Sequence, residues 1–235
     1  MGLCDAERDR VSDVAIITAI YGAYDNLKMI YPQTGIDAEW ILVTDNEQIP
    51  DGKFGWRVIR EPQPGVPPMR AAKRPKLRPW LYTDAPASIW IDGSYRVLSP
   101  RFATEVLALA DPLAQFAHPD RDCIYDEAPV SLPIPKYAGE PITAQAGHYR
   151  AAGHPERWGL WSTSAVVRHH TPLVLEHDNA WAAEIDAWST QDQVSQPFVL
   201  RNTGLRPVVL PGGGPGMPAY RLSKWLRLEA SGKHQ

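Results

Sequence analysis

The feature that most constrains the fold is a nearly all-apolar segment at residues 14–22, with the sequence VAIITAIYG. Such a run, rich in β-branched residues, is typical of a strand that is buried on both faces, as in a parallel sheet. Two similar runs, at residues 39–45 and 88–92, each end on an aspartate. Segments with helical patterns lie between the strand candidates. This alternation predicts an α/β fold, a single Rossmann-like domain with a central, mostly parallel sheet flanked by helices.

The remaining elements follow from shorter patterns. Residues 69–82 are predicted to form a helix that is broken or kinked, because Pro75 and Pro79 interrupt it. The other expected strands lie at residues 55–61, 159–169 and within 205–210; the other expected helices lie at 100–110, 136–153 and 172–188 and from Ser189 onward, with a last amphipathic segment at 220–228. We expect one domain over residues 13–230, with a flexible leader at 1–12 and a flexible tail at 231–235. The Gly/Pro-rich segment 211–216 is expected to be a flap and not a dinucleotide loop, because it lacks the GxGxxG spacing.

Charge and composition exclude several classes of protein. The 24 Lys and Arg residues against 27 Asp and Glu give a net charge of −3, too balanced for a protein whose main partner is nucleic acid. No apolar run approaches the roughly 20 residues that span a bilayer, and the first residues lack the apolar stretch of a secretory signal. With only Cys4 and Cys123, no disulfide framework is available. A cytoplasmic location is therefore expected.

The chemistry-bearing residues gather near the ends of the predicted strands. Asp45 and Asp92 end two of them, and five cations lie between these carboxylates within residues 70–78. Ligands of open parallel sheets bind beyond the carboxyl ends of the strands, so this pattern favours a phosphorylated ligand held by cations and a divalent metal, Mn²⁺ or Mg²⁺. The alternative for the cationic run is a solvated helix face. Asp92, Gly93 and Ser94 resemble a DxD metal motif in which Ser94 replaces the second carboxylate.

Several segments together resemble one family. TAIYGAYDNL, VTDN, RAAKRPKLRPW, SIWIDGSYRV, AHPDRDCIYDEA, GLWSTSAVVRHH and STQDQVSQPFVL occur in the order found in a glycosyltransferase-like domain family, whose plant members include a turgor-regulation protein and a mucilage-related glycosyltransferase. The resemblance covers residues 14–200. It implies a GT-A-type fold and transfer of a sugar from a nucleotide-diphosphate donor, with UDP and manganese as the working expectation. The acceptor hydroxyl stays open: it could belong to a glycan, a protein, a lipid or a small molecule.

The resemblance also implies roles for individual residues. Asp192 is expected to be the catalytic carboxylate that accepts the proton of the acceptor hydroxyl, although Gln191 stands where the family has Arg. Asp92 is the expected metal ligand. The implied donor-binding residues are Tyr21, Asp45, Arg70, Lys73, Asp92 and Ser94.

Further residues are candidates for the acceptor side or the pocket wall. They are His118, Asp122, Tyr125, Glu127, Trp161 and Gln193. Two of them have a structural alternative: His118 as a hydrogen-bonding residue and Trp161 as a core residue. Ser189 and Asp192 also have the spacing of a helix cap. Two other functions stay open: a non-catalytic nucleotide- or sugar-binding module, because of Ser94, and an amide hydrolase, because one plant relative has been described as a ceramidase. For a hydrolase the sequence lacks HExxH and GxSxG motifs.

Overall fold

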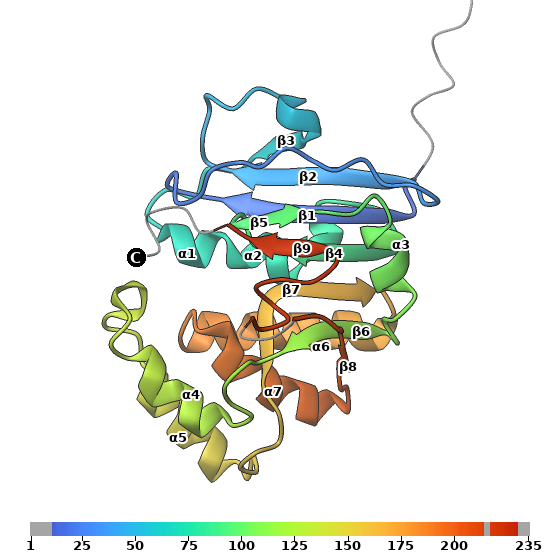
Figure 1. Cartoon of the computed structure of the whole chain (residues 1–235). Coiled ribbons are helices and arrows are strands. Elements are labelled where there is room, and N and C mark those ends of the chain that lie inside the picture. The colour runs from blue at the N-terminus through green and yellow to red at the C-terminus, as the bar shows by residue number, and fades with distance from the viewer. Residues whose placement is uncertain (1–10, 214–216, 230–235) are drawn as a thin grey trace, which may run out of the picture.

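The fold is built on a seven-stranded sheet (Figure 1). The computed structural model describes residues 11–213 and 217–229. The strands of this sheet are β1 (Val14–Ile20), β2 (Ala38–Thr44), β3 (Arg57–Arg60), β4 (Ala87–Ile91), β6 (Leu113–Ala117), β7 (Trp161–His169) and β8 (Val208–Val209). Their spatial order is β3-β2-β1-β4-β7-β6-β8. Two further short strands, β5 (Tyr95–Val97) and β9 (Leu226–Leu228), pair antiparallel with each other.

Strand direction confirms the predicted α/β class. β1 pairs parallel with β2 and β4, β2 with β3, and β6 with β8. Only β7 among the described strands of this sheet runs antiparallel to its neighbours, β4 and β6. Because β7 is reversed, its first residues lie at the edge of the sheet where its neighbours β4 and β6 end. The sheet is therefore mostly parallel, and this edge collects residues from strand ends and from the start of β7.

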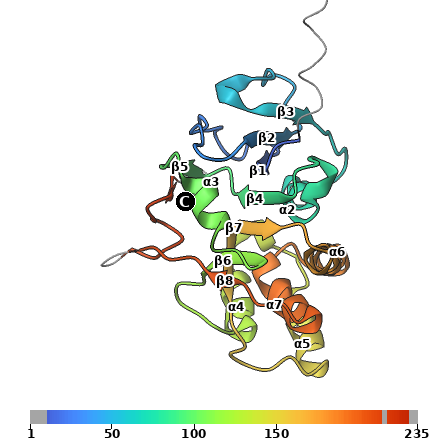
Figure 2. The same cartoon turned by 90° about the vertical axis from the view of Figure 1, so that its right-hand side faces the viewer.

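The apolar run of β1 is buried on both faces, as its sequence predicts. Side chains alternate across a strand: Ile16 belongs to the hydrophobic cluster on one face, and Ile17 to the cluster on the other. Helix α3 (Phe102–Leu107) and the C-terminal segment cover the Ile16 face. The helices at residues 68–71, 172–187 and 192–203 contribute to the cluster on the Ile17 face (Figures 1 and 2). Because an apolar layer packs against each face of the sheet, this strand carries no polar face.

The remaining helices are α1 (Pro68–Ala71), α2 (Lys73–Leu77), α4 (Ile124–Ser131), α5 (Ile142–Ala151), α6 (Pro172–Ala187) and α7 (Asp192–Thr203), with 3-10 turns at Lys53–Gly55, Pro79–Leu81 and Pro135–Tyr137. The helix expected at residues 69–82 is broken, as predicted, into α1, α2 and the second of these turns. The breaks fall at Ala72 and Arg78, because Pro75 and Pro79 each lie in the first turn of their own helix, where a missing N–H costs no intrahelical bond.

Other boundaries differ from the expectations. The helix expected at 136–153 begins only after Pro141, and residues before it form the turn Pro135–Tyr137. The amphipathic segment expected at 220–228 ends in strand β9. Most of the leader, the tail and part of the 211–216 flap lie outside the described residues. No helix in the described part of the chain is long and apolar enough to cross a membrane.

Candidate functional site

A pocket of about 780 Å³ lies at the edge of the sheet where the parallel strands end. Its wall contains Tyr21 after β1, Asp92 after β4, His118 after β6 and Thr163 near the start of β7. Residues of α1, α2 and α7 complete one side, and Tyr220 and Leu228 of the C-terminal segment complete another. Ligand pockets commonly enclose about 300–1,000 Å³, so this hollow is large enough for a nucleotide-sized ligand.

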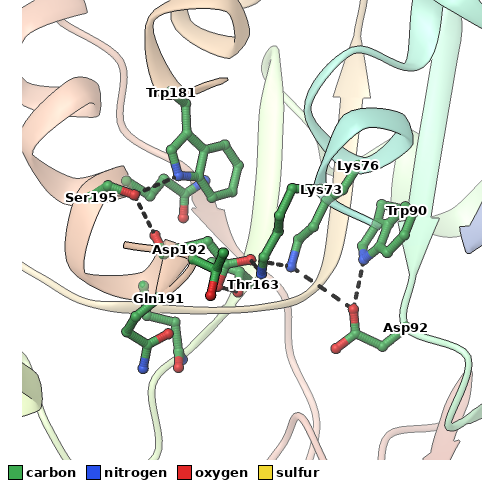
Figure 3. A network of polar contacts seen from close by, with 12 residues as sticks. Lys73, Lys76, Trp90, Asp92, Thr163, Trp181, Gln191, Asp192 and Ser195 are labelled. Atoms are coloured by element: carbon green, nitrogen blue, oxygen red, sulfur yellow. Dashed lines mark hydrogen bonds and ion pairs between the residues drawn. The ribbon is translucent and has the colours of Figure 1, made fainter. Parts of the chain in front are cut away.

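The central polar cluster of the pocket joins α2 to the start of α7 (Figure 3). The ammonium groups of Lys73 and Lys76 each donate to Oδ2 of Asp192 at 2.6 Å. The hydroxyl of Thr163 donates to the other carboxylate oxygen at 2.8 Å. Lys73 and Lys76 are three residues apart on a helix, a spacing that places them on one face. Three segments far apart in the sequence thus meet at one carboxylate.

Electrostatics favour the ionised form of Asp192. Burial alone would raise its pKa, but the ion pairs with Lys73 and Lys76 outweigh burial and hold the pKa well below its usual range. Burial also lowers the pKa of Lys73 to about 8; the charge of Lys76 adds to this effect and that of Asp192 opposes it. Behind the carboxylate, the indole N–H of Trp181 donates to Ser195, whose hydroxyl donates to the backbone carbonyl of Asp192 (Figure 3). The start of α7 is therefore fixed from both sides.

Asp92 reaches the same pocket from the end of β4. Its Oδ1 accepts the indole N–H of Trp90 at 2.7 Å and lies 3.9 Å from the ammonium group of Lys76. A Cβ at Gly93 would lie 3.1 Å from the Cβ of Asp25 and 3.2 Å from its Oδ2. The glycine therefore leaves room for Asp25 next to position 93, and Asp25 and Asp92 both line the pocket. Ser94 lines it too and is buried.

These residues could hold a metal ion only together with ligand phosphates and water. Among the described residues, no group of three or more His, Cys, Asp or Glu side chains could hold a metal ion. Mg²⁺ is commonly bound by one or two carboxylates together with substrate phosphates and waters, without an all-protein cage. Asp92 and Asp25 are a donor set of that kind. The chain could thus hold a divalent cation together with a bound diphosphate.

Arg70 lines the pocket, but much of its hydrogen-bonding capacity is used inside the fold. Its guanidinium donates to the carbonyls of Ile185 at 2.5 Å and Trp188 at 3.3 Å, and lies 3.6 Å from Glu140. The last carbonyls of a helix lack intrahelical partners. Arg70 therefore ties α1 to the C-terminal end of α6.

A second polar network of the pocket wall connects the end of β6 to α4. Nδ1 of His118 accepts two backbone N–H groups, and its Nε2 lies 3.5 Å from Glu127. Burial is the largest cause that lowers the pKa of His118. Arg121 donates to Glu127 at 2.6 Å, and the Gln191 amide donates to the other oxygen of Glu127 at 3.1 Å. Both ring nitrogens of His118 thus face protein partners, in agreement with its structural alternative.

The structure brings most of the expected site residues together. The pocket wall contains Tyr21, Arg70, Lys73, Asp92, Ser94, His118, Glu127, Asp192 and Gln193.

Four expected residues lie outside that wall. The Asp45 carboxylate accepts the backbone N–H of Gly22 at 3.1 Å. Tyr125 donates its hydroxyl to the carbonyl of His154. Trp161 is buried and packs against the ring of Trp158, the core alternative expected for it. Asp122 is exposed to solvent.

The helix cap expected at Ser189 is wrong. Helix α7 begins at Asp192 itself, so this residue occupies the first helical position and not the third. The Ser189 hydroxyl donates instead to Oε1 of Gln145 at 2.5 Å. The cap pattern misled because the segment before α7 is buried, and a buried hydroxyl bonds the nearest acceptor.

Four of the pocket residues that sequence reasoning did not single out bear on the polar contacts of the site: Lys76, Asp25, Thr163 and Tyr137. Lys76 had a signal, its spacing of three from Lys73 on a helix. Asp25 and Thr163 lie in segments quoted for the family resemblance, but nothing marked these residues or Tyr137 individually. Only the folded chain brings Asp25 to Gly93, Thr163 to Asp192 and Tyr137 to Gln191.

Comparison with known families agrees with this geometry. The sequence model described as TOD1/MUCI70, glycosyltransferase-like domain, matches residues 41–208, more than half of the chain. The chain belongs to this family. Membership confirms the resemblance seen in the sequence and supports a glycosyltransferase-like function, which implies a sugar donor and an acceptor. No curated protein sequence matches the chain.

Proposed function

We propose that the pocket binds a nucleotide-diphosphate sugar and that the protein transfers the sugar to an acceptor hydroxyl. The observation that carries this proposal is the convergence of Lys73, Asp92 and Asp192 on one pocket at the carboxyl edge of the sheet. Cations there would neutralise the diphosphate of the donor, and family membership supports a sugar as the transferred group.

The proposed reaction exchanges one bond for another. The bond between the anomeric carbon and the diphosphate oxygen breaks, and the diphosphate leaves with the electron pair. The acceptor oxygen forms the new bond to the anomeric carbon, and its proton passes to a base. The sequence predicts Asp192 as this base. Loss of transfer in Asp192→Asn with donor binding nearly intact would support that role, and weakened donor binding in the same variant would contradict it.

A divalent cation, Mn²⁺ or Mg²⁺, is part of the proposal. Asp92 and Asp25 would hold it, and it would supply positive charge to the departing diphosphate. Around that position, Trp90 orients the Asp92 carboxylate through the indole hydrogen bond. Ser94 adds a neutral hydroxyl where a second carboxylate would otherwise follow Asp92.

A thermal-shift panel of nucleoside diphosphates, UDP first, with and without Mn²⁺ tests this function. Stabilisation by one nucleoside diphosphate, stronger with Mn²⁺, followed by donor turnover with an acceptor, is the expected result. Binding without turnover on any glycan, peptide, lipid or small-molecule acceptor would favour the non-catalytic module. No response to any nucleotide would contradict both, and release of fatty acid from an amide lipid would then identify the hydrolase.

A further inference from the structure

Two lysine side chains share one carboxylate oxygen at the pocket floor. Lys73 and Lys76 both donate to Oδ2 of Asp192, whereas Oδ1 accepts the Thr163 hydroxyl (Figure 3). The side chains of Lys76 and Asp192 are only 4% and 5% exposed, and that of Lys73 is 14% exposed. This is a buried and organised group, unlike a pair of surface lysines that moves freely in solvent.

The group carries more positive charge and more donors than Asp192 can satisfy. Two ammonium groups against one carboxylate leave a surplus of one positive charge. Each ammonium has three N–H donors, and within the described residues the hydrogen bonds of Lys73 and Lys76 go to Asp192 alone. Asp92 lies 3.9 Å from Lys76, beyond hydrogen-bond distance, and its side chain is 40% exposed, so solvent weakens its compensation. A buried surplus charge is costly unless an anion pairs with it.

The contacts of Asp192 point to positioning and not to proton transfer. Its carboxylate already accepts three hydrogen bonds, two of them from ammonium groups. Strong ion pairing weakens a carboxylate as a base, since protonation would break the pairs. The same contacts hold both lysine chains in fixed places facing the pocket, which avoids the entropy loss of ordering them when a ligand binds.

Resting on the proposed function, we propose that Lys73 and Lys76 together bind the diphosphate of the donor, and that Asp192 is the positioning residue that holds the two lysines in place. The assignment adds Lys76 to the donor site. It also separates the roles of two cations in the helical segment: Lys76 binds the ligand, whereas Arg70 ties α1 to α6.

Inorganic pyrophosphate tests this assignment without knowledge of the base or the sugar. Calorimetric titration should show that Lys76→Met weakens pyrophosphate binding by about tenfold or more, as expected for loss of a charge-assisted hydrogen bond. Lys136→Met is the matched control: it removes the same charge from an exposed residue at the rim of the same pocket, and it should change affinity by less than about threefold. Equal effects of the two variants would overturn the proposal.

A second comparison tests the role of Asp192. If Asp192 positions the lysines, Asp192→Asn should weaken pyrophosphate binding by about tenfold, and Asp192→Glu, which keeps the charge, should recover part of that affinity. Pyrophosphate affinity unchanged in Asp192→Asn would overturn the positioning role and favour the base. Circular dichroism and the unfolding midpoint show whether each variant folds; if Lys76→Met does not, Lys73→Met replaces it, because Lys73 is less buried. Pyrophosphate binding that behaves as expected without any sugar turnover would reject the transferase while leaving this anion site intact.

Discussion

A buried ion pair on the α6 face of the sheet gives a sharp prediction about stability. Arg168 of β7 donates to Asp178 of α6 at 2.5 Å, and both side chains are 0% exposed. Nε and Nη2 of Arg168 make no hydrogen bond within the described residues, so the guanidinium depends on this one carboxylate. His177 also contacts Asp178, at 2.9 Å from Nδ1 to Oδ1. Asp178→Asn keeps the shape of the side chain but leaves a buried cation without its counter-charge.

The expected loss follows from this burial. Removing one partner of a buried pair costs about 3–5 kcal/mol of the free energy of unfolding. For a chain of this length each kcal/mol lowers the unfolding midpoint by about 2–4 °C, so the expected drop is roughly 6–20 °C. Thermal and urea unfolding, followed by Trp fluorescence, measure it, with an unchanged urea slope as the check on two-state unfolding.

The control is the double variant Arg168→Met with Asp178→Leu. Replacing a buried pair by apolar side chains of similar size often leaves the free energy of unfolding unchanged, because the cost of removing both charges from water offsets their attraction. The double variant should therefore be more stable than Asp178→Asn alone. A loss below about 1 kcal/mol in Asp178→Asn, or a double variant as unstable as the single one, would refute the reasoning.

Three further predictions follow from other contacts. Gly22→Ala should lower the unfolding free energy by about 1–3 kcal/mol in urea titration, because Gly22 has a φ of 61° and an added Cβ would lie 2.9 Å from Pro68; no loss would contradict this strain. The unfolding midpoint should fall as pH drops from about 6.5 towards 4, because burial lowers the pKa of His154 and of His170 to about 4 and the unfolded chain binds protons first; replacing both by Gln should flatten this dependence. Pyrophosphate affinity should decrease above pH 8, because burial lowers the pKa of Lys73 to about 8 and the neutral amine no longer attracts the anion. Calorimetry should show this decrease to be absent in Lys73→Arg, because arginine stays charged.

Sequence reasoning predicted the parts of the fold that local pattern determines. The buried runs at β1 and β4 and the proline-broken α1–α2 segment are confirmed. Strand β6 was missed because Gln115, a polar residue, lies in its middle. In the fold this amide is fully buried and exchanges hydrogen bonds with Gln196 of α7. A partner 81 residues away along the chain leaves no local signal.

The same distinction holds for the site. Strand ends and the cationic segment predicted where Asp92 and Lys73 would lie, because the carboxyl ends of parallel strands share one edge. The partners of Asp192 were not predictable, since the lysines belong to α2 and Thr163 belongs to β7, which runs antiparallel to β4 and β6. Whether a carboxylate acts as a base or as a positioning residue depends on its ion-pair and hydrogen-bond partners, and the tertiary fold determines these partners.

One wall of the pocket comes from the very end of the described chain. Strand β9 pairs with β5, which begins directly after Ser94, and Tyr220 and Leu228 line the same pocket as Asp92. These residues follow position 208, where the family match ends. Exchanging this C-terminal stretch would therefore change one wall of the pocket while Lys73, Lys76 and the strand-end aspartates stay as they are, so that wall can vary independently of the charged floor.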